Sequence, residues 1–231
     1  MSDFIIETHC HTAETSKCGK VSGERIVELY ESAGYSGIIV TDHMNSKYHG
    51  ADNELWEDKI NSFLTGYRSV KKAAGDKLDV LLGMELSLET NNNHYLVYGL
   101  TEELLFKYNY DDENNFRKMD IKKLRQFADD QGLLIIQAHP FRFKATIVNP
   151  AYLHGVEAYN EKPRKDSNND FANMWADKFG LIKTSGSDFH QEVDLACGGI
   201  ITDYRIRDND TLLNTLKSGT YTLKTSNFFS R

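Results

Sequence analysis

Strand-like segments alternate with amphipathic helical segments along the whole chain, and this alternation limits the fold more than any other feature of the sequence. Strands are expected at residues 4–8, 37–41, 80–88, 95–100, 133–138, 155–159, 181–185, 199–202 and 221–225. Several of these segments are continuously apolar, which is typical of parallel strands buried on both faces. Segment 95–100 follows segment 80–88 so closely that a bent or hairpin-like pair is also expected there.

Helical segments lie between the strands. Two of them carry capping residues and terminal glycines: Ser22 and Gly34 around residues 24–33, and Asp120 and Gly132 around residues 121–131. A third has one apolar face made by Ile60, Phe63, Tyr67, Val70 and Ala74, and two more are expected at residues 171–179 and 211–217. Repeated strand–helix units favour parallel strands with helices outside. The expected fold class is α/β, with a closed or nearly closed β/α barrel first and a doubly wound open sheet second.

The composition is that of an ordinary globular protein. Of 231 residues, 40% are hydrophobic, 26% are charged and only 3 are prolines. No linker or repeat interrupts the chain, so one domain over residues 1–231 is expected. Apolar runs such as residues 133–136 are far shorter than the roughly 18 residues of a spanning helix, and the N-terminus has no leader-like region. The cysteines are three in number and widely spaced (Cys10, Cys18 and Cys197), which fits a reduced compartment better than a disulfide framework. Together these features predict a cytoplasmic protein without a membrane partner.

The net charge argues against polyanionic partners. It is −7, from 34 acidic and 27 basic residues, so binding to nucleic acid is not expected. A small anionic substrate would need a local positive feature. The sequence leaves the oligomeric state open.

Histidines and carboxylates gather at the ends of the expected strands. His9 and His11 end the first, Thr41-Asp42-His43 the second, and His139-Pro140 the fifth, while Glu85 lies in the third, His94 begins the fourth, and Asp188 and His190 follow the seventh. Because strand side chains alternate, His9 and His11 project together, as do Asp188 and His190. In a β/α barrel the C-terminal strand ends converge on one mouth, so residues this far apart in sequence can meet.

This set of side chains predicts a metal-dependent hydrolase. Six neutral imidazoles and two carboxylates supply eight ligands but only about two negative charges, enough for two or three divalent cations with positive charge left over. Glu85 can bridge two metals, and a water between them becomes a hydroxide near neutral pH. Phosphate esters are the natural substrates, since metals neutralise phosphoryl oxygens.

The ordered motifs resemble those of the PHP (polymerase and histidinol phosphatase) family. They are His9-x-His11-Thr12, Thr41-Asp42-His43, Glu85, His94, His139-Pro140 and Ser187-Asp188-Phe189-His190. The resemblance implies a distorted seven-stranded β/α barrel with a trinuclear metal centre that hydrolyses small phosphomonoesters, such as histidinol phosphate or nucleotides. Zn, Mn and Fe all suit such ligands.

The resemblance also implies an assignment of ligands and of the catalytic carboxylates Glu85 and Asp188. One metal would be held by His9, His11, Glu85 and Asp188, a second by Glu85, His94 and His139, and a third by His43 and His190. The family usually supplies one further His or Asp to the third metal just after the first motif. Residues 15–19 contain neither, and Cys18 is a candidate thiolate ligand there, with an inert thiol equally consistent.

Several other polar residues accompany these motifs. Arg142 lies three residues after His139 and is expected to bind the substrate phosphate. Lys162, Arg164 and Lys165 form a basic cluster, for which a solvated charged turn is favoured over an anion-guiding loop. Glu157 and Asn160 end the sixth strand, where orienting a ligand and simple loop polarity are equally plausible. His49 and His154 lie outside the motifs and are interpreted as surface or loop residues.

Two alternative functions remain open. Amidohydrolase-like barrels, including metal-dependent deoxyribonucleases, also begin with His-x-His, but they end on a lone Asp and do not need Thr41-Asp42-His43. PHP modules also occur inside bacterial DNA polymerases, so a non-catalytic module with a polymerase partner is the second alternative. A full set of buried ligands is costly to retain without a metal-dependent function, which favours the enzyme.

Overall fold

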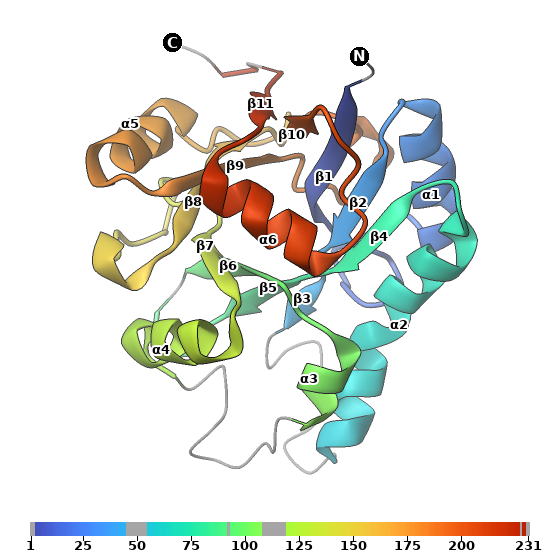
Figure 1. Ribbon diagram of the computed structural model, residues 1–231, viewed down its shortest axis with the longest axis horizontal. Helices are drawn as coiled ribbons and strands as arrows, with labels where there is room; N and C mark the ends of the chain where they lie inside the picture. Colours follow the sequence, from blue (N-terminus) through green and yellow to red (C-terminus); the bar gives the residue numbers. More distant parts are fainter. Residues whose placement is uncertain (1–2, 45–54, 92, 108–118, 227, 230–231) are drawn as a thin grey trace.

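The fold consists of strands enclosed by helices (Figure 1). The computed structural model describes residues 3–44, 55–91, 93–107, 119–226 and 228–229. The elements are β1 (Phe4–Cys10), α1 (Gly23–Ser32), β2 (Gly37–Val40), β3 (His43–Met44), α2 (Trp56–Ala74), β4 (Asp79–Leu82), β5 (Met84–Ser87), β6 (His94–Tyr98), α3 (Glu102–Lys107), α4 (Ile121–Gln131), β7 (Leu134–Gln137), β8 (Gly155–Asn160), α5 (Asn169–Phe179), β9 (Ile182–Gly186), β10 (Gly199–Thr202), α6 (Asn209–Ser218) and β11 (Thr222–Lys224).

The strands form two mixed sheets. One has the order β11-β10-β1-β2-β4 and the other the order β3-β5-β6-β7-β8-β9. Parallel strands were favoured, but besides the expected pair of β5 and β6 the sheets contain further antiparallel pairs, which are β6 with β7, β10 with β1 and β11 with β10. The connection between β5 and β6 is too short for a crossover helix, so the two strands form the expected hairpin-like pair.

The two sheets meet at both sides. On one side, Gly83 separates β4 from β5, and its N–H donates to Val40 O at 2.8 Å. The single strand expected at residues 80–88 is therefore two strands, one in each sheet. On the other side, Phe189 exchanges hydrogen bonds with His9 and His11 of the first sheet, both at 3.0 Å. The strands thus surround a common interior, although their hydrogen-bond pattern separates them into two sheets. A closed seven-stranded barrel stays a prediction.

Two apolar cores hold the elements together. One packs α1, α2 and α4 against the outer faces of the strands, and the other combines inward side chains of both sheets with α6. In the second core, Leu212, Leu213 and Leu216 of α6 lie with Ile6 and Ile136 at the end of the strands opposite the histidines. In Figure 1, α1 and α2 lie on one side of the strands, α4 and α5 on the other, and α6 crosses in front. The ligand-bearing strand ends are therefore held on a packed interior.

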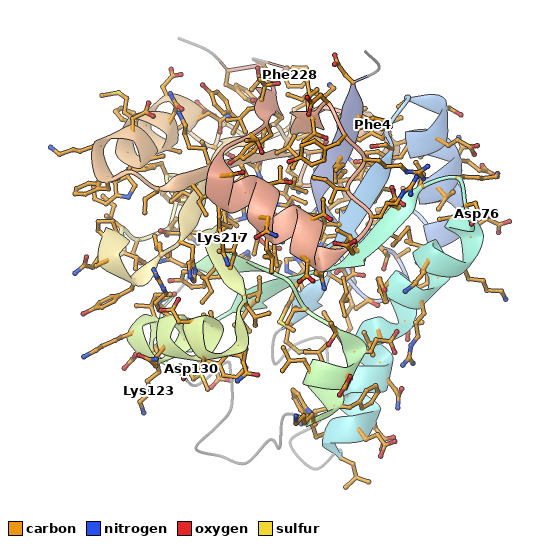
Figure 2. All side chains as sticks on the ribbon, viewed as in Figure 1. Phe4, Asp76, Lys123, Asp130, Lys217 and Phe228 are labelled. Carbon is orange, nitrogen blue, oxygen red and sulfur yellow. The ribbon has the colours of Figure 1, made fainter. Side chains whose placement is uncertain are left out.

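The helix ends follow the sequence predictions. The Ser22 hydroxyl accepts from Arg25 N–H, and the Asp120 carboxylate accepts from Lys123 N–H, so α1 and α4 are capped as expected. The apolar face predicted for the third helix is buried in α2. Helix α3 was not predicted, because its six residues are too few to show a clear period. Figure 2 shows the outer face of α4, with Lys123 and Asp130 pointing away from the strands.

Among the described residues, no helix combines the length and the apolar character that a membrane span requires.

Candidate metal centre

The structure brings all eight predicted histidine and carboxylate ligands to one place. They come from both sheets: His9 and His11 from the end of β1, His43 from β3, Glu85 from β5, His94 from β6, His139 after β7, and Asp188 and His190 after β9. Seven are buried, and His94 is partly exposed. The sequence prediction that these distant residues meet is therefore geometrically correct.

The Glu85 carboxylate is surrounded by imidazole rings. Its Oε1 lies 2.8 Å from His94 Nδ1 and 3.1 Å from His139 Nε2. Its Oε2 lies 2.9 Å from His43 Nδ1 and 3.2 Å from His11 Nε2. Each oxygen thus faces two rings, which is the arrangement needed for a carboxylate that joins two cations.

His9 and His11 face each other through their Nε2 atoms, which are 3.1 Å apart. The opposite nitrogen of each ring is already engaged: His9 Nδ1 is 2.8 Å from Glu157 Oε1, and His11 Nδ1 is 3.3 Å from Ser16 Oγ. A carboxylate can only accept, so His9 donates from Nδ1 and directs Nε2 at the centre. A proton or a metal ion must lie between the two Nε2 atoms to make their approach favourable.

A third group lies beside the first two. Ring nitrogens of His11, His43 and His190 lie within 4.8 Å of one another. Burial would raise the pKa of the half-buried Cys18, but hydrogen bonds from His190 and His43 outweigh it and lower that pKa to about 5. Cys18 is therefore a thiolate next to the ligands of the expected third metal.

Two basic side chains contact Asp188. Lys162 Nζ lies 3.1 Å from Asp188 Oδ1, and Arg142 Nη2 lies 3.0 Å from Oδ2. The solvated turn predicted for the basic cluster is wrong for Lys162, which is only 5% exposed. Arg164 is ion-paired with Asp194. A buried lysine was missed because only the folded chain shows that the loop after β8 turns inward.

The backbone is strained at two of the ligands. His139 has φ of 33° and Asp188 has φ of 47°, a left-handed region that non-glycine residues rarely adopt. Each residue follows the end of a strand, where the chain turns to direct the side chain into the site. Strain of about 1–3 kcal/mol per residue is typically found at functional sites.

A buried network around Asp42 holds the first loop in place. Its Oδ1 accepts from Thr12 N–H at 2.8 Å and from Ser16 Oγ at 2.6 Å. Ser16 Oγ in turn accepts from His43 N–H at 3.1 Å. Asp42 and Ser16 were not identified from the sequence as positioning residues, although Asp42 belongs to the Thr41-Asp42-His43 motif.

Glu157 was expected either to orient a ligand or to be a polar loop residue. Its carboxylate contacts His9 Nδ1 at 2.8 Å, so it orients that ring.

Charges in the site shift several ionisation equilibria. Burial alone would raise the pKa of Glu85, but His43 and His94 hold it well below its usual value. Burial would also raise the pKa of Asp188, and Lys162 is the largest of the groups that instead lower it. Both carboxylates are therefore anions at neutral pH, the form that binds divalent cations.

The residues present fit a set of metal ions. Three groups can each hold one ion: His9, His11 and Glu85; His43, Glu85 and His94; and His11, His43 and His190. Glu85 Oε2 is buried and accepts no hydrogen bond of good geometry from the described residues. Burial and neighbouring cations lower the pKa of His11 and lower that of His139 to about 4. Both rings are therefore neutral near pH 7, the form in which an imidazole nitrogen can bind a metal ion. A buried anionic oxygen without a well-aligned hydrogen bond, surrounded by ring nitrogens, is what a divalent cation would satisfy.

Residues 7–218 match the PHP domain family. This chain belongs to the PHP family. Its fold is similar to PsfC from Pseudomonas syringae PB-5123, with a TM-score of 0.70 and 16% identity over 98% of this chain and 93% of that chain. It is also similar to a two-domain protein from Bacteroides vulgatus that contains a predicted PHP-like metal-dependent phosphoesterase, with a TM-score of 0.66 and 16% identity over 97% of this chain and 65% of that chain.

A third structure similar to this PHP chain is PfuEndoQ, a lesion-specific endonuclease from Pyrococcus furiosus. The TM-score is 0.63 at 16% identity, over 96% of this chain and 58% of that chain. At such identity the likeness establishes a shared fold and nothing finer. No curated protein sequence gives a significant match.

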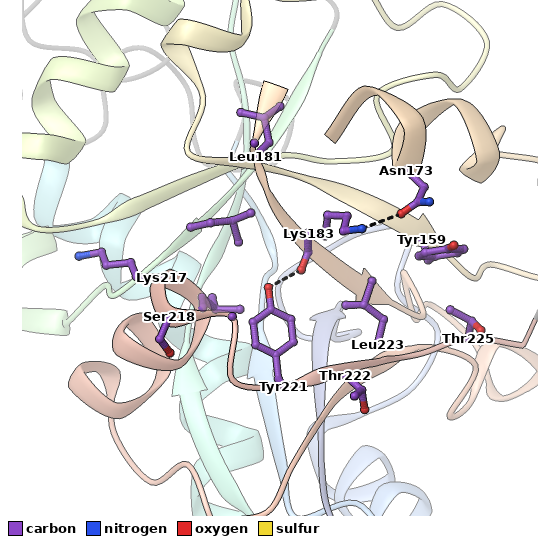
Figure 3. Close-up of a pocket in the computed structure, with 14 residues that line it drawn as sticks. Tyr159, Asn173, Leu181, Lys183, Lys217, Ser218, Tyr221, Thr222, Leu223 and Thr225 are labelled. Carbon is purple, nitrogen blue, oxygen red and sulfur yellow. Dashed lines mark hydrogen bonds between the residues drawn. The ribbon is translucent and has the colours of Figure 1, made fainter. Parts of the chain in front are cut away.

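A separate pocket of about 720 Å³ lies between α5, β9, α6 and β11 (Figure 3). Tyr221 Oη donates to Lys183 O at 2.7 Å, and Lys183 Nζ donates to Asn173 Oδ1 at 3.1 Å. None of the proposed ligands lines this pocket, so it is distinct from the metal centre.

Two histidines of the chain lie outside the motifs. His154, interpreted as a surface or loop residue, forms hydrogen bonds with Asp129 and with Ile135 N–H. His49 lies outside the described residues.

Proposed function

We propose that this PHP protein is a metal-dependent hydrolase of small phosphomonoesters. The observation that carries the proposal is the Glu85 carboxylate, whose two oxygens face His11, His43, His94 and His139 within 3.2 Å. Such a cluster has the ligand types and the spacing of a multinuclear centre. Membership of the PHP family, with similar structures described as metal-dependent phosphoesterases, supports the same chemistry.

The proposal assigns ligands to two or three divalent ions (Zn, Mn or Fe). The first ion would be held by His9, His11, Glu85 and Asp188, the second by Glu85, His94 and His139, and the third by His43, His190 and Cys18. When bound, such ions neutralise phosphoryl oxygens and make water more acidic. Contact of the Cys18 thiol with the rings of His43 and His190 supports its place in the third group.

Protein groups around the ions would complete the site. Glu85 and Asp188 are the proposed catalytic carboxylates, and Arg142 is the proposed substrate-binding cation, because its guanidinium lies against Asp188 and is partly buried. In the reaction, water forms a new P–O bond, the ester P–O bond breaks, and the alcohol leaves with a proton. Glu157 and Ser16 hold the rings of His9 and His11 in their ligating orientations.

The rest of the proposal follows from the whole chain. We propose one PHP-type domain over residues 1–231 and a cytoplasmic location, which three unpaired cysteines support. The proposed partner is a small phosphorylated metabolite. Nucleic acid fits the charge of −7 poorly, but the similarity to an endonuclease makes a diesterase the second candidate.

A metabolite screen on metal-assayed protein tests the proposal. Protein loaded separately with Zn, Mn and Fe would be offered an aryl phosphate, histidinol phosphate, nucleotides with a 3′-phosphate and a lesion-containing DNA duplex. Release of phosphate from a monoester, lost after chelation and restored by metal, is the expected result. Cleavage of DNA alone would favour the diesterase, and inactivity of fully loaded protein on every substrate would refute the enzyme.

A further inference from the structure

Lys162 is a buried cation that contacts two of the proposed ligands. Its side chain is about as enclosed as the ligands, and Nζ lies 3.1 Å from Asp188 Oδ1 and 2.9 Å from His190 Nδ1. An ammonium group out of contact with water is unfavourable unless it has an anionic partner. A lysine in this position is therefore part of the charge balance of the site.

Arg142 approaches the same carboxylate from its other oxygen. Its Nη2 lies 3.0 Å from Asp188 Oδ2, 2.6 Å from Asn160 Oδ1 and 3.0 Å from Ser167 Oγ. One carboxylate thus faces two cations, so Asp188 alone does not balance the charge of both. Neither Lys162 nor Arg142 is among the proposed metal ligands, so both cations are available for another role in the site.

The loop that carries Lys162 is fixed on both sides. Glu161 N–H donates to Gly186 O at 2.9 Å, and Pro163 restricts the backbone just after Lys162. Two residues on, Arg164 binds Asp194 through Nε at 2.9 Å and Nη2 at 2.6 Å. The ammonium group is therefore held in position before any ligand arrives, which lowers the entropic cost of using it.

We propose that Lys162, beside Arg142, selects substrates with a terminal phosphate and disfavours phosphodiesters. This inference rests on the proposed function and names the side chain that would set its preference for monoesters over diesters. A monoester carries nearly two negative charges near neutral pH and offers three non-bridging oxygens. A diester carries one charge, offers two such oxygens and needs room for a second ester arm. Two fixed, enclosed cations on one side match the dianion and leave the diester with weaker pairing.

Comparison of one substrate pair on three variants tests the proposal. The substrates are p-nitrophenyl phosphate and bis(p-nitrophenyl) phosphate, and the variants are Lys162→Met, Lys162→Arg and, as the matched control, Lys165→Met. Lys165 lies on the same loop with the same charge but is exposed. For Lys162→Met we expect kcat/KM to fall roughly ten- to a hundredfold on the monoester, with little change on the diester. Lys162→Arg should recover part of the loss, and Lys165→Met should resemble the wild type on both substrates.

Two measurements on the same samples do not depend on turnover. Elemental analysis should give equal metal content in all variants, and calorimetric titration with inorganic phosphate should show binding weakened by a similar factor in Lys162→Met alone. An equal fall on both substrates, unchanged phosphate affinity, or loss of metal in both Lys162 variants would overturn the proposal. If the metal-loaded wild type hydrolyses neither substrate, the proposed function fails, whereas the phosphate titration still decides whether Lys162 binds the dianion.

Discussion

Glu85 is the residue on which the proposed centre depends most, because both of its oxygens face ring nitrogens from several strands. Replacing it with Gln keeps its shape but removes the charge, and a neutral amide bridges two cations poorly. We expect Glu85→Gln to lose at least one metal equivalent and roughly a hundredfold or more in kcat. Elemental analysis with steady-state kinetics measures both, and exposed Glu103→Gln is the control. Full metal content and full activity in Glu85→Gln would contradict the proposed role of Glu85 in joining two metal ions.

Arg142 differs from the ligands because a cation does not bind metal. Its guanidinium lies 3.0 Å from Asp188 Oδ2 and is mostly buried, so it is well placed to pair with phosphoryl oxygens. We expect Arg142→Ala to lower kcat/KM roughly ten- to a hundredfold while metal content stays the same. Arg142→Lys should recover only part, since lysine lacks the planar fork. Kinetics unchanged from the wild type would limit Arg142 to its structural contacts with Asp188, Asn160 and Ser167.

The three cysteines are expected to differ in reactivity, because their thiol pKa values are shifted in different directions. Hydrogen bonds from His190 and His43, against the effect of burial, lower the pKa of Cys18 to about 5, whereas burial raises the pKa of Cys197 to about 12 and that of buried Cys10 well above its usual value. In chelated protein, iodoacetamide should therefore label Cys18 first. The rate should be nearly constant above about pH 6 and fall below about pH 5, as the thiolate takes up a proton. Peptide mass spectrometry identifies the labelled site.

The same labelling experiment tests whether Cys18 is a ligand. A thiolate bound to a metal is shielded, so added Zn should protect Cys18 from iodoacetamide. Equal labelling with and without saturating metal would show an inert thiol, which was the other interpretation of the sequence.

At the residue scale, the sequence was informative where side-chain direction depends only on the strand. His9 and His11 were expected to project together, and their Nε2 atoms are 3.1 Å apart. Lys162 could not be recognised in this way. Its burial depends on Pro163 and on the Arg164–Asp194 ion pair across the loop, and neither the pair nor the inward turn has a local signal.

At the scale of elements, an irregularity in β1 places the first two ligands. The register of β1 against β2 shifts between Glu7 and Cys10. Ile6 belongs to the interior core, yet His9 and His11 also point inward, so strict alternation is broken between them. The sequence predicted the strand and the shared direction of the histidines. It did not predict the shift, because the shift depends on pairing with β2 and on contact with Phe189.

Helix α2 approaches the site closely because Gly66 has no side chain. A Cβ there would overlap Thr12 Oγ1 and lie 2.5 Å from Asp42 Oδ2. Gly to Ala inside a helix normally stabilises by about 1 kcal/mol, but here we expect Gly66→Ala to destabilise by roughly 1–3 kcal/mol. Urea unfolding measures the change, and Ser62→Ala on the exposed face of α2 is the control. A Gly66→Ala variant more stable than the wild type would contradict the packing described for α2.

At the scale of the whole molecule, the proposed ligands come from both sheets. His9 and His11 belong to the first sheet, whereas Glu85, His94 and His139 belong to or follow strands of the second. The sequence predicted this convergence from the alternation of strands and helices. It did not predict the division into two sheets, because the break between β4 and β5 at Gly83 and the antiparallel pairing of β10 with β1 depend on contacts between distant segments.

Metal ions bound in this centre would join the two sheets, so we expect them to stabilise the fold. Ions that bind only the folded chain, at 100 times their Kd, add about 2.7 kcal/mol. For a chain of this size that corresponds to a rise in Tm of roughly 5–11 °C. Lowering the pH should shrink the shift, because imidazoles with a reference pKa of about 6.5 take up protons in competition with metal. Scanning calorimetry of chelated and reloaded protein at several pH values measures this. Glu85→Gln should show a much smaller shift, and an equal shift in that variant would place the stabilising metal elsewhere on the chain.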